Sequence, residues 1–182
     1  MNAMSKYVAF LRAINVGGHT VKMDQLRRIF EDMALSNVET FIASGNVIFN
    51  STSRNTKALE SKIEGYLHKA LGYEVATFIR SVPELEEIAA YNPFTESEVN
   101  DPGNALFVGF LGSRPSPDSR RKLESCASKI DSFRIHEREL YWLLRGKFTE
   151  SEFSGARLEK TLGMPATLRN ITTVRKIALK YS

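Results

Sequence analysis

A nearly unbroken apolar run close to the start of the chain constrains most strongly what this sequence can fold into. Residues 7–14 read Y-V-A-F-L-R-A-I, and Arg12 is the one charged side chain among them. A strand with one solvated face alternates polar and apolar residues, so this run predicts a strand buried on both faces. Asn15, Gly17 and Gly18 follow it and predict a turn whose backbone passes through positive φ.

The rest of the first half predicts a β-α-β-β-α-β order. Ser44-Gly45-Asn46 separates two β-rich segments and predicts a tight hairpin turn. Gly72 stands where a glycine ends a helix. The predicted elements are strand 7–14, helix 23–34, strands 38–43 and 47–50, helix 56–71 and strand 74–80.

The same order recurs in the second half, after a short acidic helix that Asn92-Pro93 ends. Apolar residues at i, i+3, i+4 and i+7 from Val174 predict a terminal helix, capped by Thr172 or Thr173. The other predicted elements are strand 105–111, helix 117–130, the hairpin 132–136 and 140–145, helix 155–162 and a last strand at 166–168.

We therefore predict an α+β fold of two ferredoxin-like units in tandem, packed as one globular protein with a C-terminal helix. The first unit takes residues 6–91 with the connecting helix, and the second takes residues 92–182. Strand 105–111 is apolar on both faces, like strand 7–14, so both sheets are expected to be covered on both sides. Phe10, Leu11, Phe107 and Phe110 are expected to be buried.

The composition fits a globular protein of this size. The chain has 182 residues, 42% of them hydrophobic, which is enough for a core in one domain or two small units. It has no apolar run near the ~20 residues of a membrane span and no signal-peptide core at its start, so a cytoplasmic location is expected. The single cysteine, Cys126, agrees with a reducing compartment and is expected to be buried on helix 117–130.

Positive charge is concentrated in the second half. Residues 1–91 carry ten Lys/Arg and ten Asp/Glu, whereas residues 92–182 carry fifteen and eleven, which accounts for the net charge of +4. From Arg157 onward there are six basic residues against Glu159 alone. The excess is compatible with a phosphate-bearing partner and equally with a solvated basic helix end.

Four motifs together resemble a bacterial family known as a domain of unknown function. They are F-L-R-A-I-N-V-G-G at the start, S-G-N-V-I-F in the first hairpin, N-P-F at 92–94 and A-T-L-R-N-I-T-T-V-R-K-I near the end. The resemblance runs from Lys6 to Lys180 and implies a duplicated ferredoxin-like fold. It implies no activity and no catalytic residues.

The expected strand order 4-1-3-2 places the end of the first strand beside the start of the third. This brings the glycine turn and the hairpin turn to one sheet edge, next to the first helix and its backbone N–H groups. Such an edge can bind a small anion or phosphate, or its polar groups can simply tie the two turns together. The candidate residues are Arg12, Asn15, Gly17, Gly18, Lys22, Ser44, Gly45 and Asn46.

A second candidate group precedes the terminal helix. Arg169 and Asn170 lie next to a helix N-terminus, whose dipole favours negative charge, and Thr167 is nearby. Ligand contact and helix capping both explain these residue types.

Other chemistries receive little support. The three histidines are scattered and no cysteine pair exists, so neither a metal site nor a cofactor is indicated, and no catalytic constellation is recognisable. Residues 106–111 resemble the first motif of RNA-recognition modules, but the partner motif is missing. Three functions stay open: a binder of a phosphate-bearing small molecule, a nucleic-acid (RNA) binder, and a protein-interaction module with no ligand. The oligomeric state is open as well.

Overall fold

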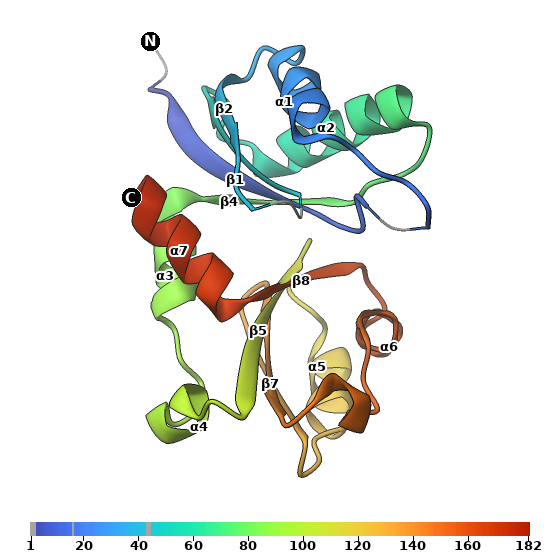
Figure 1. Ribbon diagram of the computed structural model, residues 1–182, viewed down its shortest axis with the longest axis vertical. Helices are drawn as coiled ribbons and strands as arrows, with labels where there is room; N and C mark the ends of the chain where they lie inside the picture. The colour runs from blue at the N-terminus through green and yellow to red at the C-terminus, as the bar shows by residue number, and fades with distance from the viewer. Residues whose placement is uncertain (1–2, 16, 43–44) are drawn as a thin grey trace. The chain divides into compact units, whose positions relative to one another are not determined.

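The computed structural model describes residues 3–15, 17–42 and 45–182. The chain divides into two compact units. Unit 1 comprises Met1–Leu85 with Ser182, and unit 2 comprises Glu86–Tyr181. Each contains a four-stranded antiparallel sheet with helices, which confirms the predicted tandem α+β fold (Figure 1).

Unit 1 has the predicted β-α-β-β-α-β order. Its sheet has the strand order β2-β3-β1-β4, the predicted 4-1-3-2, and every pairing is antiparallel. Helix α3 (Val82–Ala90) begins directly after the last strand and crosses the boundary between the units. The elements are β1 (Ser5–Leu11), α1 (Met23–Glu31), β2 (Ser36–Thr40), β3 (Asn46–Ser51), α2 (Thr56–Leu71) and β4 (Thr77–Ser81).

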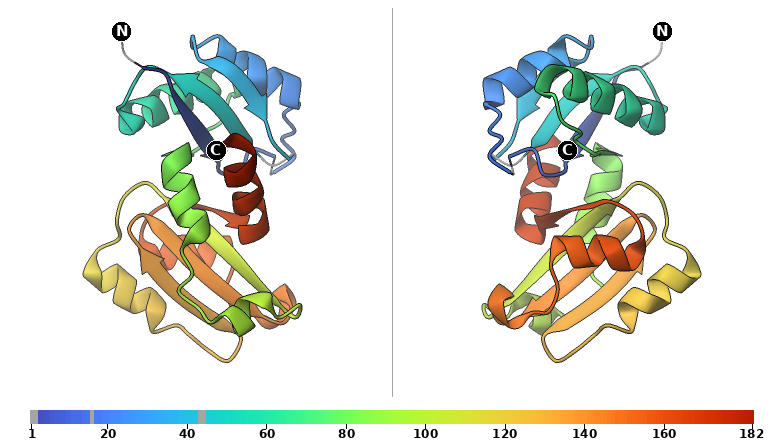
Figure 2. Two further views of the ribbon diagram at one scale, coloured as in Figure 1. Left: turned by 90° about the vertical axis from the view of Figure 1, so that its left-hand side faces the viewer. Right: turned by 90° about the vertical axis from the view of Figure 1, so that its right-hand side faces the viewer.

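Helices α1 and α2 cover one face of the unit 1 sheet (Figure 1 and Figure 2). Tyr7, Ala9 and Leu11 point to that face and pack in the core formed with the helices. Val8 and Phe10 alternate with them on the opposite face and are also fully buried. The prediction of a strand buried on both faces is therefore confirmed for residues 7–11. The predicted range 7–14 is too long, because β1 ends at Leu11 and Ala13 turns the chain with a φ of +53°.

Unit 2 repeats the arrangement, with the strand order β6-β7-β5-β8. Trp142 on β7 lies in the core with residues of α5 and α6, and its indole N–H donates to buried Asp131 at 2.8 Å. The elements are α4 (Glu96–Asn100), β5 (Asn104–Leu111), α5 (Pro117–Glu124), β6 (Asp131–His136), β7 (Glu139–Arg145), the 3₁₀ turn η1 (Phe148–Glu150), α6 (Gly155–Leu162), β8 (Ala166–Asn170) and α7 (Ile171–Tyr181).

The two sheets repeat in register as well as in order. β1 reads Y-V-A-F-L at 7–11 and β5 reads F-V-G-F-L at 107–111. Val8 pairs with Arg80 on β4, and Val108 pairs with Arg169 on β8, so an arginine occupies the same place in both sheets. In each case a guanidinium Nη1 donates to the preceding carbonyl at 2.9 Å. The duplication of the two units therefore extends from strand order to the placement of this arginine.

The second face of the unit 2 sheet carries α7 and the end of α3. Helix α7 packs on β5 and β8, and the Tyr141 hydroxyl donates to the Ile88 carbonyl at 3.1 Å. The predicted terminal helix is confirmed, but its predicted threonine cap is wrong. Thr172 lies inside the helix, and its N–H donates to the side chain of Asn170 at 2.9 Å.

The predicted helix 117–130 is too long. Helix α5 ends at Glu124, and Cys126 is half-buried instead of fully buried. Ser125 Oγ and Cys126 Sγ both donate to the Lys122 carbonyl, and Ser128 Oγ accepts from two backbone N–H groups further on. Short polar side chains that bond the backbone compete with helix formation, which explains the early end.

Candidate functional site

The predicted meeting of the β1 end and the β2–β3 turn is confirmed. Phe10 pairs with Asn46, and the Leu11 N–H donates to the Gly45 carbonyl at 2.8 Å. Ser44, which belongs to the same predicted group, lies outside the described residues. The strand order alone therefore placed these two segments correctly.

Both asparagines of the predicted group bond within the protein. Asn15 Oδ1 accepts from the Val21 N–H at 2.8 Å, which closes the loop between β1 and α1. Asn46 is 1% exposed, and its Nδ2 donates to the Phe41 carbonyl at 3.0 Å across the hairpin. These two side chains shape the turns.

The glycines divide into an exposed pair and a buried one. Gly17 and Gly18 are exposed at φ of +65° and +82° in the loop, whereas Gly45 is buried at +76°. A Cβ on Gly45 would lie 3.0 Å from atoms of Leu11 and Ile14. The hairpin side of the edge is therefore closely packed, and the loop side is open.

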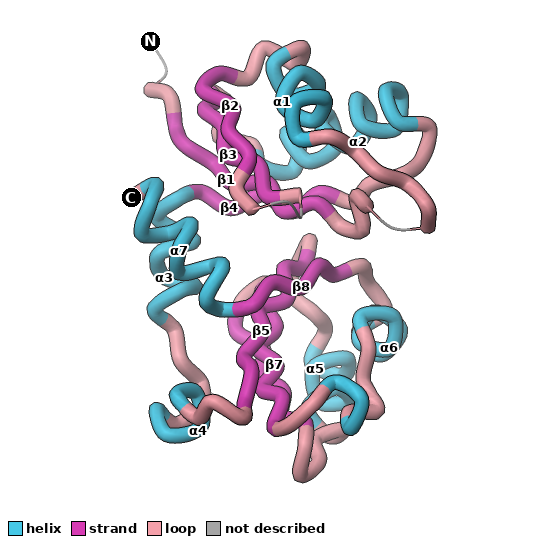
Figure 3. The backbone as a smooth tube through the Cα atoms, viewed as in Figure 1, coloured by secondary structure: helices cyan, strands magenta, loops and turns pink. Residues whose placement is uncertain are grey.

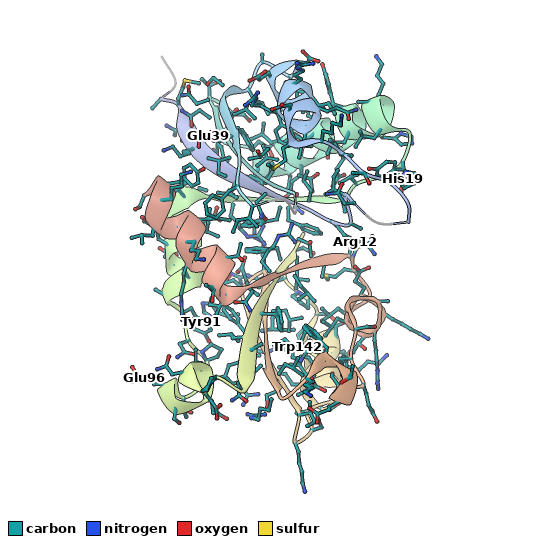
Figure 4. The ribbon with its side chains drawn as sticks, viewed as in Figure 1. Arg12, His19, Glu39, Tyr91, Glu96 and Trp142 are labelled. Atoms are coloured by element: carbon teal, nitrogen blue, oxygen red, sulfur yellow. The ribbon has the colours of Figure 1, made fainter. Side chains whose placement is uncertain are left out.

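Arg12 and Lys22 lie at the two ends of the connection between β1 and α1, which Figure 3 shows as part of the backbone trace. Arg12 lies directly after β1 and is half-buried. Its backbone N–H donates to the Ala76 carbonyl at 2.9 Å. Lys22 is exposed directly before α1, and among the described residues no side chain caps the first turn of that helix. Figure 4 shows Arg12 and His19 on the side of unit 1 that carries the loop.

Tyr73 holds the loop in place, a role that the sequence did not indicate. Its hydroxyl donates to the Ile14 carbonyl at 2.8 Å, and its ring stacks on His19 with 4.0 Å between centroids. Burial raises the pKa of the Tyr73 phenol, so the hydroxyl, which is protonated at neutral pH in any case, stays a donor further into the alkaline range.

The second predicted group, Arg169 and Asn170, belongs to unit 2. The Arg169 guanidinium donates to Thr167 Oγ1 at 2.8 Å and to the Leu168 carbonyl at 2.9 Å. Burial lowers its pKa to about 10, so it keeps its charge at neutral pH. Asn170 is the last residue of β8, and its side chain accepts from the Thr172 N–H in the first turn of α7. Both residues thus have contacts inside the unit, and a ligand role for them stays a prediction.

Unit 2 contains a cavity at the same topological place as the predicted site of unit 1. It has a volume of about 230 Å³ and lies between the segment after β5 and the β6–β7 turn. We call it the Arg114 cavity. It is lined by Tyr91, Arg114, Pro115, Arg120, Ile135, His136 and Glu137. Strand order alone predicts this sheet edge in unit 2, but it does not predict that Tyr91, from the segment after α3, lines a cavity there.

The two aromatic residues of the RNA-recognition-like motif lie on opposite faces of β5: Phe107 faces the helices α5 and α6, and Phe110 on the other face is fully buried. Phe107 is predicted to be buried, but it is only half-buried. It packs against the cluster that contains Leu123 and Leu158. Its ring contacts Trp142, with 5.5 Å between centroids. An RNA-recognition module stacks bases on sheet aromatics, and this residue points away from the sheet face opposite the helices. The placement gives no support to the nucleic-acid alternative.

In the described part of the chain, no group of three or more His, Cys, Asp and Glu side chains is arranged to hold a metal ion. None of its helices combines the length and hydropathy needed to cross a bilayer.

Comparison with known proteins supports the fold and gives no activity. Residues 4–141 match a family described as "Protein of unknown function (DUF1697)". The chain is also similar to a solved structure, that of the conserved bacterial protein SP0830 from Streptococcus pneumoniae, with 23% identity, a TM-score of 0.77 and 98% of each chain covered. At that identity the likeness is one of fold. No curated protein matches the chain.

Proposed function

Because the chain belongs to DUF1697, a family of proteins of unknown function, we propose its function from its own geometry: it binds a small phosphate-bearing anion at the loop after β1. The binding groups are Arg12, Lys22 and the exposed backbone of Gly17 and Gly18. Asn15 and Asn46 support the turns and do not contact the ligand.

The observation that carries this proposal is an exposed pair of glycines, Gly17 and Gly18, between two cations and between anchored residues of the same loop. Asn15 closes the loop through the Val21 N–H, and Tyr73 holds it through the Ile14 carbonyl. A loop fixed before binding loses little conformational entropy when a ligand arrives. Successive N–H groups in turns with positive φ form concave sites that favour anions.

The charge of the loop supports the same ligand class. Between residues 12 and 22 the charged residues are Arg12 and Lys22, with no acidic residue. Asp24 in the first turn of α1 is exposed and pairs with Arg27 at 3.1 Å. Arg12 can bind phosphate oxygens in bidentate geometry, and Lys22 adds charge beside the uncapped helix turn.

A thermal-shift titration with inorganic phosphate, pyrophosphate and sugar phosphates tests the proposal. A specific ligand at a hundred times its Kd stabilises the folded state by ~2.7 kcal/mol, which is a clear rise in Tm. Arg12→Ala should abolish the rise. Arg54→Ala, which removes an exposed arginine elsewhere in unit 1, is the matched control and should retain it.

Two results would overturn the proposal. One is the absence of stabilisation by every phosphate compound tested. The other is a large loss of Tm in ligand-free Arg12→Ala together with an unchanged response to the ligand. That second result would assign Arg12 to a structural contact, since losing the partner of a buried group costs ~1–3 kcal/mol.

A further inference from the structure

We propose that the Arg114 cavity of unit 2 binds a nucleoside monophosphate, with its arginines on the phosphate and its stacked aromatic side chains on the base. This site is separate from the loop after β1. It lies wholly within unit 2, and the inference stands whether or not unit 1 binds an anion.

The fold creates the cavity by the same geometry that forms the unit 1 edge. The Leu111 N–H donates to the Arg138 carbonyl at 3.0 Å, which holds the β5 end beside the β6–β7 turn. In that turn Glu137 has a φ of +55°, so the chain reverses sharply. Arg114 and Pro115 extend from the strand end, and Tyr91 closes the cavity from the segment after α3.

The cationic side of the cavity comes from Arg114 and Arg120. Their side chains are 72% and 53% exposed, and each pairs with one carboxylate, Arg114 with Glu137 and Arg120 with Glu124. Each pair joins one guanidinium nitrogen to a carboxylate oxygen, and a guanidinium has five N–H donors. Exposed ion pairs are weak, so a phosphate can take the place of the carboxylates and bind in bidentate geometry.

The opposite side is an aromatic wall. Tyr91 and His136 stack with 4.1 Å between centroids and an interplanar angle of 13°. Tyr91 also contacts Tyr141, whose hydroxyl is bound to the Ile88 carbonyl. Rings held in this way offer a fixed surface on which a base can stack, a contact that protein sites for nucleotides use widely.

Polar atoms on this wall are available to a ligand. Within the part of the chain that the structure describes, the Tyr91 hydroxyl and the His136 ring nitrogens have no hydrogen-bond partner. They can bond to ring nitrogens or exocyclic groups of a base. An inorganic anion would leave the aromatic side unused, so the combination favours a nucleotide over phosphate alone.

The volume limits the size of the ligand. At about 230 Å³ the cavity is below the ~300–1,000 Å³ of sites that enclose drug-sized molecules. It can hold a base and the groups next to it, with the remainder of a monophosphate in solvent. A dinucleotide cofactor would lie mostly outside.

Isothermal titration calorimetry on the full chain tests the inference with AMP, GMP, CMP and UMP. Inorganic phosphate and the four nucleosides serve as separate titrants, so the contributions of phosphate and base can be told apart. We expect at least one nucleotide to bind more tightly than either of its parts.

Neighbouring arginines on α5 provide a matched pair of variants. Arg120→Ala removes a lining residue and should weaken nucleotide binding about tenfold, the usual effect of losing a charged hydrogen bond. Arg121→Ala removes an arginine of the same helix that pairs with Asp118 and does not line the cavity, so its Kd should be unchanged. Both side chains are exposed, and both variants should fold.

His136→Ala tests the aromatic wall. It should weaken nucleotide binding about tenfold, a typical loss for one base stacked on an aromatic ring, while His136→Phe should retain most of the affinity. Arg12→Ala in unit 1 should have no effect, which separates failure here from failure of the first proposal. The inference is overturned if no nucleotide binds, if phosphate binds as tightly as nucleotides, or if Arg120→Ala and Arg121→Ala behave alike.

Discussion

The two units share one backbone frame and differ where a strand end meets a hairpin turn. The Leu11 N–H donates to the Gly45 carbonyl in unit 1, and the Leu111 N–H donates to the Arg138 carbonyl in unit 2. Around Gly45 this junction is closed by apolar packing. In unit 2 the turn carries Glu137 and borders a cavity lined by charged and aromatic side chains.

This difference shows that the strand topology determines where a site can form, and that the side chains at that place determine what it can bind. The strand order brings a strand end and a turn together in both units, because antiparallel neighbours begin where their partners end. A glycine at the turn allows close packing, whereas charged residues at the turn keep it open to solvent. A ligand of unit 1 would therefore contact the glycine loop, and one of unit 2 would enter between loop and turn.

The largest predicted loss of stability comes from a difference between the hydrophobic cores of the two units. Phe49 and Trp142 occupy the same register place, opposite Tyr7 and Phe107, but only the indole needs an acceptor. That acceptor is Asp131, which is 2% exposed and also accepts from Ser151 Oγ. Asp131→Ala should therefore lower the free energy of unfolding by about 3 kcal/mol, since it leaves buried donors unpaired and a small cavity.

Urea denaturation followed by far-UV circular dichroism measures this loss. Asp118→Ala, which removes an exposed aspartate of the same unit, is the control and should stay within ~0.5 kcal/mol of wild type. Adding Trp142→Phe to Asp131→Ala should cost less than the sum of the single changes, because the indole no longer lacks an acceptor. Strict additivity would show that the Trp142–Asp131 bond does not distinguish the two cores.

The next effect probes the closed junction of unit 1. Gly45→Ala should destabilise by about 2 kcal/mol, because it adds backbone strain at positive φ and a Cβ that contacts Leu11 and Ile14 at 3.0 Å. Gly18→Ala has similar strain at φ +82° but no atom within 4 Å, so its cost should be about 1 kcal/mol. Thermal denaturation compares them. Equal losses would show that the junction is not closely packed.

The sequence predicted the parts of this comparison that follow from apolar periodicity. The doubly buried β1 and the terminal helix follow from where apolar residues fall along the chain, and the strand order follows from the ferredoxin-like fold that the β-α-β-β-α-β element order predicts. The premature end of α5 does not, because Ser125 and Ser128 stop it with side-chain hydrogen bonds while the apolar spacing continues.

The unit 2 cavity escaped prediction for a different reason. Its lining comes from residues far apart in the chain, and Tyr91 belongs to a connecting segment that has no place in the duplicated pattern. The stacking of Tyr91 on His136 is a tertiary contact without a local signal. In unit 1 the loop ligand candidates were adjacent in sequence, which is why the sequence alone could single them out.

The smallest predicted effect is a dependence of stability on pH that arises from a carboxyl group of unit 2. Helix α4 precedes β5 in unit 2, and its Glu98 accepts from Arg145 at 2.6 Å, from the Thr95 N–H at 3.1 Å and from the Thr95 hydroxyl at 2.9 Å. These bonds, the one from Arg145 first, lower the pKa of the Glu98 carboxyl to about 2. A carboxyl with a lowered pKa stabilises the fold fully above its unfolded value of ~4.3, and the contribution disappears as pH falls toward about 2.

Glu98→Gln should therefore have a lower Tm than wild type at pH 7, and the two Tm values should converge as the pH falls from 4.5 toward 2. The fluorescence of Trp142, the single tryptophan of the chain, reports this transition from the core of unit 2. Glu96→Gln removes a charge from the same helix without touching Arg145, so its Tm should follow the wild-type pH profile. If Glu98→Gln also runs parallel to wild type down to pH 2, the Glu98–Arg145 contact is not what gives unit 2 its sensitivity to acid. The modest size of the expected shift follows from exposure, because both side chains are about one-third exposed and solvent weakens their attraction.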